Sequence, residues 1–203
     1  MAFTYFFRDL QTLELMRDYA LPVLQTYQHI NIWDAGCAMG PEPYTLAIIL
    51  RENMGHMYFR NVTIHATDID ECNLFGPIIQ KAVYTRQETE RIPPDILTKY
   101  FIPQSDGQSF QIIDEIRNSL QFKQHDLLSL EPISTGIGLI LCKNVLLHFN
   151  EEQRIKVITM FWDALRPGGF FAAEQTQKMP KELEHLFEQV VSHAQLFRKR
   201  DQG

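Results

Sequence analysis

A loop of small residues separates an apolar, strand-like run from an apolar, helix-like run early in the chain. The first run ends at Asp34, and Gly36, Ala38 and Gly40 then let the backbone turn sharply and come close to a ligand. Because parallel strands present their carboxyl ends to a ligand crevice, Asp34 is expected to point into solvent or ligand. Glu42 follows in the first helical turn, where exposed backbone N–H groups favour a carboxylate. This order predicts a nucleotide-type site.

The spacing of the loop argues against a pyrophosphate ligand. It reads G-x-A-x-G, whereas the dinucleotide fingerprint is G-x-G-x-x-G. Glu42 also places a negative charge where a phosphate would sit. A ligand that carries an ammonium or sulfonium cation fits better, and S-adenosylmethionine carries both. The loop alone leaves open a tight strand-to-helix turn without a ligand.

Alternating strand and helix patterns predict the fold that must position these residues. Parallel strands are expected at 30–34, 62–70, 122–128, 138–145 and 170–173, helices at 41–50, 71–83, 92–100, 150–165 and 180–189, and a closing strand pair within 190–200. Acidic or polar residues follow successive strands. The pattern predicts an α/β, Rossmann-like fold: an open, mostly parallel, doubly wound sheet with its ligand crevice outside the carboxyl ends.

The chain is expected to form a single domain over 1–203. Its 203 residues, 45% of them hydrophobic, can bury one good core. A helical lead-in is expected over 1–28, with Pro22 breaking its pattern near the end. Polar turns between short apolar runs predict a small antiparallel β insert over 100–122.

Composition excludes several classes of protein. A formal charge of −6 argues against a general nucleic-acid binder, which usually shows a basic stripe. Three cysteines without CxxC spacing indicate neither a disulfide framework nor a zinc site and fit a reducing cytoplasm; Cys37 and Cys142 are interpreted as small apolar fillers. The histidines form no HExxH pair, so no metal is expected. No apolar stretch is long enough to insert into a membrane, and no signal peptide pattern opens the chain.

Five motifs follow one another along nearly the whole chain. They are T-x-F-F-R at 4–8, G-x-E-P-Y-[ST] at 40–45, TDID at 67–70, C-[RK]-N-V-x-x-x-F at 142–149 and L-[RK]-P-G-G at 165–169. In this order they resemble the CheR family of chemotaxis-receptor methyltransferases, which use S-adenosylmethionine to methylate glutamate side chains. The resemblance implies a methyltransferase domain with S-adenosylmethionine as cofactor and S-adenosylhomocysteine as product.

The resemblance also implies a role for each residue of the cofactor wall. Glu42 would bind the amino group of the methionine moiety, and Arg8 its carboxylate, which makes Arg8 a catalytic candidate as well. Thr4 would add a hydroxyl contact, and Asp68 would accept hydrogen bonds from the ribose hydroxyls. The small residues of the loop and Asp34 complete this wall.

The remaining expected site residues lie in the second half of the chain. Asp126 and Leu127 would border the adenine. Lys143 and Asn144 would contact the cofactor and face the methyl group and the incoming carboxylate. Lys143 and His148 are the other catalytic candidates.

Three of these assignments have structural alternatives. Arg8 could be a surface residue of the first helix. Asp68 could cap the next helix, although Asp70 is the better placed cap. Asp126 could be a turn former.

Three features depart from the family's usual pattern. Lys143 stands where the family usually has arginine, and it keeps the charge but loses the bidentate fork. His148 stands where the family usually has tyrosine; it can still donate a hydrogen bond, but an imidazole titrates near neutral pH. Typical members also carry a helical domain before the catalytic one, implicated in receptor contact, whereas this chain starts almost at T-x-F-F-R.

The implied function is protein-glutamate O-methyl transfer to a chemoreceptor-like helical protein, with the β insert docking a partner. Such a transfer is an in-line displacement by a carboxylate that is already ionised, so no strong general base or Ser/His/Asp triad is required. Two alternatives stay open. One is a methyltransferase for a different acceptor, and the other is a catalytically weakened regulatory module that binds S-adenosylmethionine or S-adenosylhomocysteine.

Overall fold

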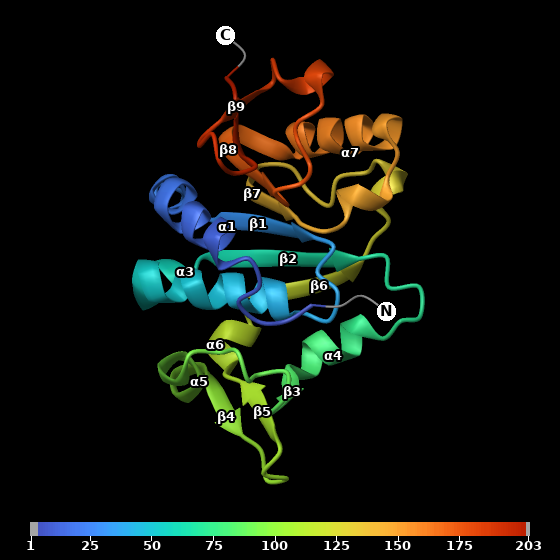
Figure 1. The fold of residues 1–203 in the computed structure, drawn as a ribbon. Helices are drawn as coiled ribbons and strands as arrows, with labels where there is room; N and C mark the ends of the chain where they lie inside the picture. The colour runs from blue at the N-terminus through green and yellow to red at the C-terminus, as the bar shows by residue number, and fades with distance from the viewer. Residues whose placement is uncertain (1–3, 202–203) are drawn as a thin grey trace.

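A seven-stranded sheet in the order β6-β2-β1-β7-β8-β10-β9 runs through the molecule (Figure 1). The computed structural model describes residues 4–201. The strands are β1 (Ile30–Ala35), β2 (Val62–Asp68), β6 (Leu120–Gln124), β7 (Ile137–Cys142), β8 (Leu165–Ala173), β9 (Phe187–Gln189) and β10 (Leu196–Lys199). β6, β2, β1, β7 and β8 are parallel to one another. β10 pairs antiparallel with β8 on one side and with β9 on the other. The strand order reverses between β1 and β7, where this kind of sheet opens its ligand crevice. The predicted fold class is confirmed.

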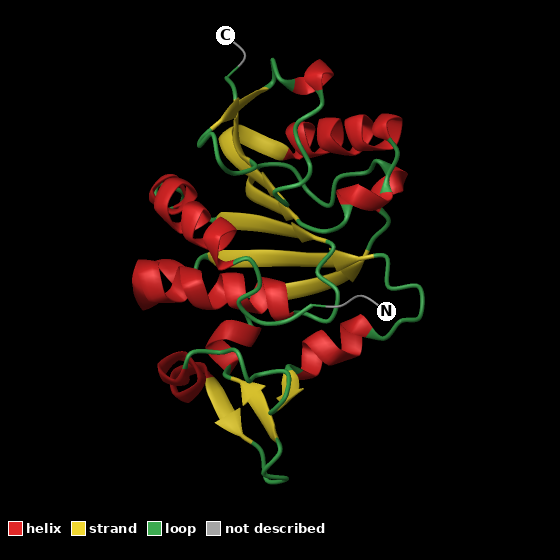
Figure 2. Cartoon of the chain, viewed as in Figure 1, coloured by secondary structure: helices red, strands yellow, loops and turns green. Residues whose placement is uncertain are grey.

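Helices cover both faces of this sheet (Figure 2). One face carries α1 (Leu10–Leu15), the π-helical η1 (Met16–Ala20), α2 (Leu21–Leu24) and α3 (Pro41–Phe59), and the other carries α7 (Glu151–Ala164). The side chains of β7 alternate between the two cores: Leu139 and Leu141 pack with the α3 side, Ile140 and Cys142 with the α7 side. Cys37 is buried in the first core, so both cysteines predicted to be apolar fillers are in cores.

A second, three-stranded antiparallel sheet lies at one end of the molecule (Figure 1). Its order is β3 (Val83–Thr85), β5 (Ser109–Ile112) and β4 (Phe101–Pro103), with α4 (Phe75–Lys81), α5 (Pro94–Tyr100) and α6 (Asp114–Arg117) around it. The predicted insert, 100–122, differs from this unit at both ends. The short run 83–85 follows a helix directly but pairs with β5, and 120–122 pairs with β2 in the main sheet.

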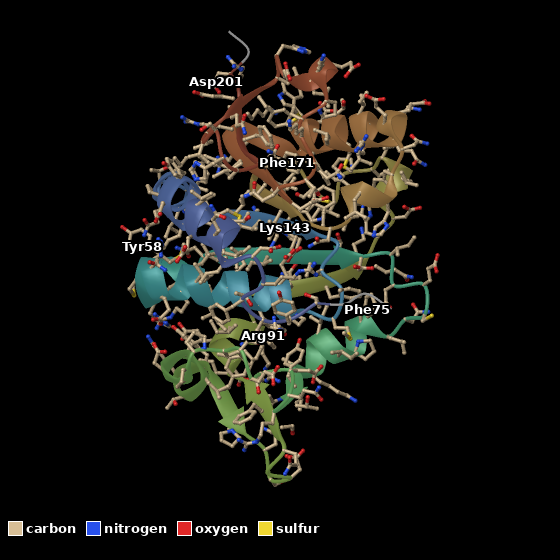
Figure 3. All side chains as sticks on the ribbon, viewed as in Figure 1. Tyr58, Phe75, Arg91, Lys143, Phe171 and Asp201 are labelled. Carbon is tan, nitrogen blue, oxygen red and sulfur yellow. The ribbon has the colours of Figure 1, made fainter. Side chains whose placement is uncertain are left out.

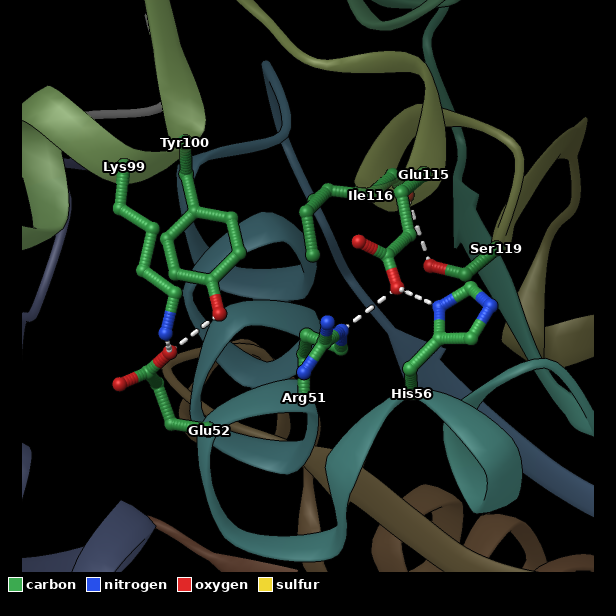
Figure 4. A network of polar contacts seen from close by, with 8 residues as sticks. All are labelled: Arg51, Glu52, His56, Lys99, Tyr100, Glu115, Ile116 and Ser119. Carbon is green, nitrogen blue, oxygen red and sulfur yellow. Dashed lines mark hydrogen bonds and ion pairs between the residues drawn. The ribbon is translucent and has the colours of Figure 1, made fainter.

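A network of charged side chains joins α3 to this small unit (Figure 4). Arg51 Nε donates to Glu115 Oε1 of α6 at 2.5 Å. The carboxylate of the next residue, Glu52, accepts hydrogen bonds from both Lys99 and Tyr100 of α5. The small sheet is therefore fixed to the helix whose first turn carries Glu42.

Replacing Glu52 with glutamine is expected to weaken the fold in a pH-dependent way. Its two donors hold the pKa of Glu52 below the usual carboxyl value. A lowered folded-state pKa stabilises the fold above the unfolded-state pKa, and that stability is lost as pH falls through the folded-state pKa. Because the group is partly exposed, we expect Glu52→Gln to cost less than about 1 kcal/mol at neutral pH.

Urea denaturation at several pH values checks this. The difference between Glu52→Gln and the unmodified chain should shrink on acidification, while the exposed Glu71→Gln should leave stability unchanged at every pH. A difference that stays constant from neutral to acidic pH would contradict the assignment.

The helices predicted at 71–83 and 180–189 differ from the structure. The helix predicted at 71–83 begins only at Phe75, because the Asp70 carboxylate accepts from the N–H groups of Leu74 and Phe75 at 2.8 and 3.0 Å. Asp70 is therefore the cap, as expected. The helix predicted at 180–189 is wrong: η4 (Lys181–Leu183) is a single 3₁₀ turn, and Phe187 enters β9 and packs on Phe171 and Phe197. Burial of that ring outweighs the local helical pattern.

Pro22 does not end the lead-in helix. The chain widens into η1 just before it, and Pro22 then occupies the first turn of α2, which continues to Leu24. A π-helical segment already interrupts the regular ladder, so the missing proline N–H is tolerated there. α7 begins with a capping box, in which Asn150 Oδ1 accepts from the Gln153 N–H at 2.9 Å.

Among residues 4–201, no helix has both the length and the apolar character needed to cross a bilayer. Within the same range, no group of three His, Cys, Asp or Glu side chains could hold a metal ion.

Candidate active site

The loop after β1 is held against β2 at the carboxyl edge of the sheet. The Gly36 N–H donates to the Thr67 carbonyl at 2.7 Å, and the Ala38 N–H donates to Asp68 Oδ2 at 2.9 Å. Gly36 has a φ of 106°, and a Cβ atom there would lie 2.1 Å from Val145 Cγ2. Only glycine fits this conformation and this space.

A cavity of about 620 Å³ opens beside this loop, within the range of roughly 300–1,000 Å³ usual for small-molecule sites. Its lining comes from the N-terminal segment and from the carboxyl ends of β1, β2, β6 and β7 with the segments that follow them, which is the crevice predicted from the sheet topology. With the exceptions of Asp34 and Gly40, every predicted site residue lines it. These are Thr4, Arg8, Gly36, Ala38, Glu42, Asp68, Asp126, Leu127, Lys143, Asn144 and His148.

Asp34 and Gly40 lie behind the cavity wall. The expectation that Asp34 points into solvent or ligand is wrong, because β1 continues to Ala35 and the loop closes over the Asp34 side chain, which is fully buried. Neither carboxyl oxygen of Asp34 has a hydrogen-bond partner among the described residues. Burial raises its pKa well above the usual value, and the charge of Glu42 adds to the effect. Gly40 instead starts α3, and a Cβ atom there would lie 2.7 Å from Tyr84 Oη.

Lys143 forms a buried ion pair at the centre of the molecule (Figure 3). Its Nζ lies 3.0 Å from Glu42 Oε2 and 3.2 Å from Asp9 Oδ2, and its side chain has no exposed surface. Burial acts to lower the pKa of Lys143, but the two carboxylates outweigh it and raise that pKa. Burial raises the pKa of Glu42, and Lys143 opposes this shift. Lys143 lines the cavity as predicted, but its ammonium group binds the acidic wall, not an open acceptor position.

The first motif bridges the two sides of the cavity. The Phe7 N–H donates to Thr45 Oγ1 of α3 at 3.1 Å, and Arg8 Nη2 donates to Asn144 Oδ1, beyond the end of β7, at 3.4 Å. Thr4 lines the same cavity. The alternative that Arg8 is a surface residue of the first helix is wrong, because α1 begins only at Leu10 and the guanidinium contacts the site.

Asp68 and Asp126 combine a position in the lining with a structural contact. Asp68 does not cap α4, and its Oδ1 accepts from the Asp70 N–H at 3.3 Å. Asp126 Oδ1 accepts from the Leu128 N–H at 2.8 Å, which caps the 3₁₀ turn η2 (Leu127–Ser129). Both expected roles, the ribose contact for Asp68 and the adenine border for Asp126, stay predictions.

Three polar residues of this region were missed by the sequence analysis: Asp9, His125 and Glu174. His125 lines the cavity after β6; burial first, and then Lys123, lowers its pKa, and its Nε2 has no partner among the described residues. Glu174 directly follows β8. The rule that polar residues at strand ends face the crevice could have found His125, whereas Glu174 does not line the cavity and Asp9 gave no signal beyond its place after Arg8.

Comparison with known proteins decides the family. The family model described as CheR methyltransferase, SAM binding domain, matches residues 2–196. The chain belongs to the CheR methyltransferase family. This match confirms the resemblance, the methyltransferase class and S-adenosylmethionine as the cofactor.

Relatives of this CheR chain are described as chemotaxis protein methyltransferases. It is 30% identical over 204 residues to chemotaxis protein methyltransferase 2 of Vibrio cholerae, covering 97% of this chain and 67% of the relative. It is 31% identical over 166 residues to the chemotaxis protein methyltransferase of Listeria innocua, covering 81% and 60%. The CheR chain thus spans 60 to 67% of the length of these two relatives.

A solved structure supports the CheR fold independently. The rRNA methyltransferase aviRa from Streptomyces viridochromogenes matches with a TM-score of 0.56, covering 98% of this chain and 86% of that one at 12% identity. At this identity the likeness concerns the fold alone.

Proposed function

We propose that this CheR domain transfers the methyl group of S-adenosylmethionine to glutamate carboxylates of a chemoreceptor-like helical protein. The observation that carries the proposal is the distribution of charge in one cavity. The Glu42 carboxylate, the Arg8 guanidinium and the Asn144 amide all line it, and Arg8 contacts Asn144. These groups suit the ammonium and the carboxylate of a methionine moiety, and Asp68 suits ribose hydroxyls.

The chemistry at this site depends on position and on the exclusion of water. When bound, S-adenosylmethionine supplies an electrophilic methyl group. The acceptor carboxylate is already ionised, so the chain has to align it and has no proton to remove. Val145, Leu147 and Phe149 supply the apolar part of the lining that keeps water from the transfer position.

Lys143 acts on the cofactor side in this proposal. Its ammonium lies 3.0 Å from Glu42 Oε2 and opposes the rise in the Glu42 pKa that burial causes. The polar contacts for an incoming carboxylate then come from Arg8, Asn144 and His148, all of which line the cavity.

Exposed apolar residues at the rim suit a macromolecular acceptor. Ile69, Leu128 and Leu147 line the cavity, and their exposed fractions are 49%, 40% and 46% respectively. An amphipathic helix that presents a glutamate could cover them. In this proposal the small sheet β3-β5-β4 docks the partner, and the protein works in the cytoplasm.

Methyl labelling tests the proposal directly. Incubation with methyl-labelled S-adenosylmethionine and a helical receptor fragment should give label that base releases, as expected for a carboxyl ester. A fragment with its candidate glutamates replaced by glutamine is the matched control and should remain unlabelled. Label that withstands base would identify a different acceptor, and absence of transfer to any glutamate-bearing fragment would refute the proposal.

One observation favours a second candidate, a regulatory module that binds S-adenosylmethionine or its product without turnover. Lys143 is committed to Glu42 and Asp9 and is withdrawn from the acceptor side. Tight cofactor binding without methyl transfer, not restored by Lys143→Arg combined with His148→Tyr, would support the module. Transfer by the unmodified chain would exclude it.

A further inference from the structure

Glu174 is a buried acid beside the proposed transfer position. It directly follows β8, and the pairing of Cys142 with Ala173 places Glu174 next to Lys143 across the two strand ends. Only 6% of Glu174 is exposed. It does not line the cavity, so it acts on the site only through a neighbour.

That neighbour is Asn144. The Asn144 N–H donates to Glu174 Oε2 at 3.1 Å, while Glu174 Oε1 has no partner among the described residues. Asn144 has a φ of 58°, in the left-handed region that residues other than glycine adopt at a cost. A buried carboxylate that accepts from this N–H stabilises the turn that the chain needs at the end of β7.

The Asn144 side chain carries the effect into the cavity. Its Oδ1 accepts from Arg8 Nη2 at 3.4 Å, and both residues line the cavity. Burial raises the pKa of Glu174, whereas hydrogen bonds from backbone N–H groups and the charges of Lys143 and His148 oppose that shift. A carboxyl oxygen can accept the Asn144 N–H whether or not the group is ionised, so the contact does not depend on the charge of Glu174.

We propose that Glu174 is a positioning residue for methyl transfer: it fixes the Asn144 backbone so that the Asn144 amide holds Arg8 in place. The expected effect on kcat rests on the proposed function, whereas the expected effect on the Asn144 backbone does not. Glu174 itself touches neither cofactor nor acceptor.

Two substitutions separate hydrogen bonding from charge. Glu174→Ala should lower kcat by roughly tenfold through misplacement of the Asn144 amide and Arg8. Glu174→Gln keeps an oxygen that can accept the Asn144 N–H and should recover most of that loss. Because Arg8 and Asn144 also suit the methionine carboxylate, affinity for S-adenosylhomocysteine should fall together with kcat in Glu174→Ala and recover in Glu174→Gln. The exposed Glu184→Ala is the matched control and should behave as the unmodified chain does.

A double-mutant cycle tests whether the effect passes through Asn144. Glycine adopts a positive φ without support, so Asn144→Gly has no need of Glu174 and has no side chain to position. Glu174→Ala should therefore cost little further activity in the Asn144→Gly background. An equal loss in both backgrounds, or an unchanged kcat in Glu174→Ala alone, would overturn the proposal.

The Asn144 amide resonance gives a readout that needs no acceptor. In ¹H–¹⁵N spectra, Glu174→Ala should shift this resonance and speed its hydrogen exchange, and Glu174→Gln should change both less. If the unmodified chain methylates no receptor fragment, only the proposed function has failed and this measurement still decides. An unchanged Asn144 resonance in Glu174→Ala would contradict the positioning role.

Discussion

Replacing Glu42 with glutamine is expected to lower the affinity for S-adenosylhomocysteine by roughly 10- to 100-fold, the worth of a hydrogen bond to a charged group. The substitution keeps the size of the side chain but removes the negative charge from the cavity wall. It also leaves Lys143 paired with Asp9 alone, so less of the positive charge near the ligand ammonium is compensated. Titration calorimetry measures the change.

The control must separate this effect from a general effect of charge at a helix start. Glu151 occupies the first turn of α7 as Glu42 occupies that of α3, but it lies outside the cavity. Glu151→Gln should leave the affinity unchanged. Circular dichroism shows whether Glu42→Gln remains folded. An unchanged affinity for S-adenosylhomocysteine in a folded Glu42→Gln chain would show that Glu42 does not bind the ligand.

The second large effect is expected for Gly36→Ala. The new methyl group would lie 2.1 Å from Val145 Cγ2, and alanine would also have to adopt a φ of 106°. Overpacking and backbone strain together should cost about 2–4 kcal/mol of unfolding free energy. Because Val145 lines the cavity, binding of S-adenosylhomocysteine should weaken too.

Gly107→Ala isolates the strain from the clash. Gly107 also has a positive φ, 65°, but no atom lies within 4 Å of the place of its Cβ. We expect this control to lose about 1 kcal/mol and to keep its affinity for S-adenosylhomocysteine. Urea denaturation measures the free energy of unfolding of both variants. Equal losses would show that the contact with Val145 adds nothing to the cost of Gly36→Ala.

The parallel core of the fold could be predicted because its signals are local. The apolar run at 30–34 and the glycines of the loop that follows it each indicate local structure without reference to distant residues. Elements that depend on distant partners could not be predicted in this way. The run 187–189 reads as helix but becomes β9 because it completes the edge of β10, and 83–85 becomes a strand only by pairing with β5.

The same division holds for the site. Glu42, Arg8 and Asp68 belong to motifs, and their places in the cavity follow from the sheet topology. The direction in which Lys143 points depends on Asp9 and Glu42, which are far from it in sequence, and no spacing rule reveals that contact. Asp34 was misjudged because one extra residue of strand, Ala35, decides whether its side chain faces the ligand or the core.

Selection of the ligand ammonium by Glu42 is the central claim, and one comparison tests it most directly. Titration calorimetry of S-adenosylhomocysteine and of an analogue with hydrogen in place of the amino group should be run on the unmodified chain and on Glu42→Gln. The unmodified chain should bind the analogue roughly 10- to 100-fold more weakly, and Glu42→Gln should discriminate little between the two. An equal loss in both chains would place the ammonium elsewhere and contradict the account.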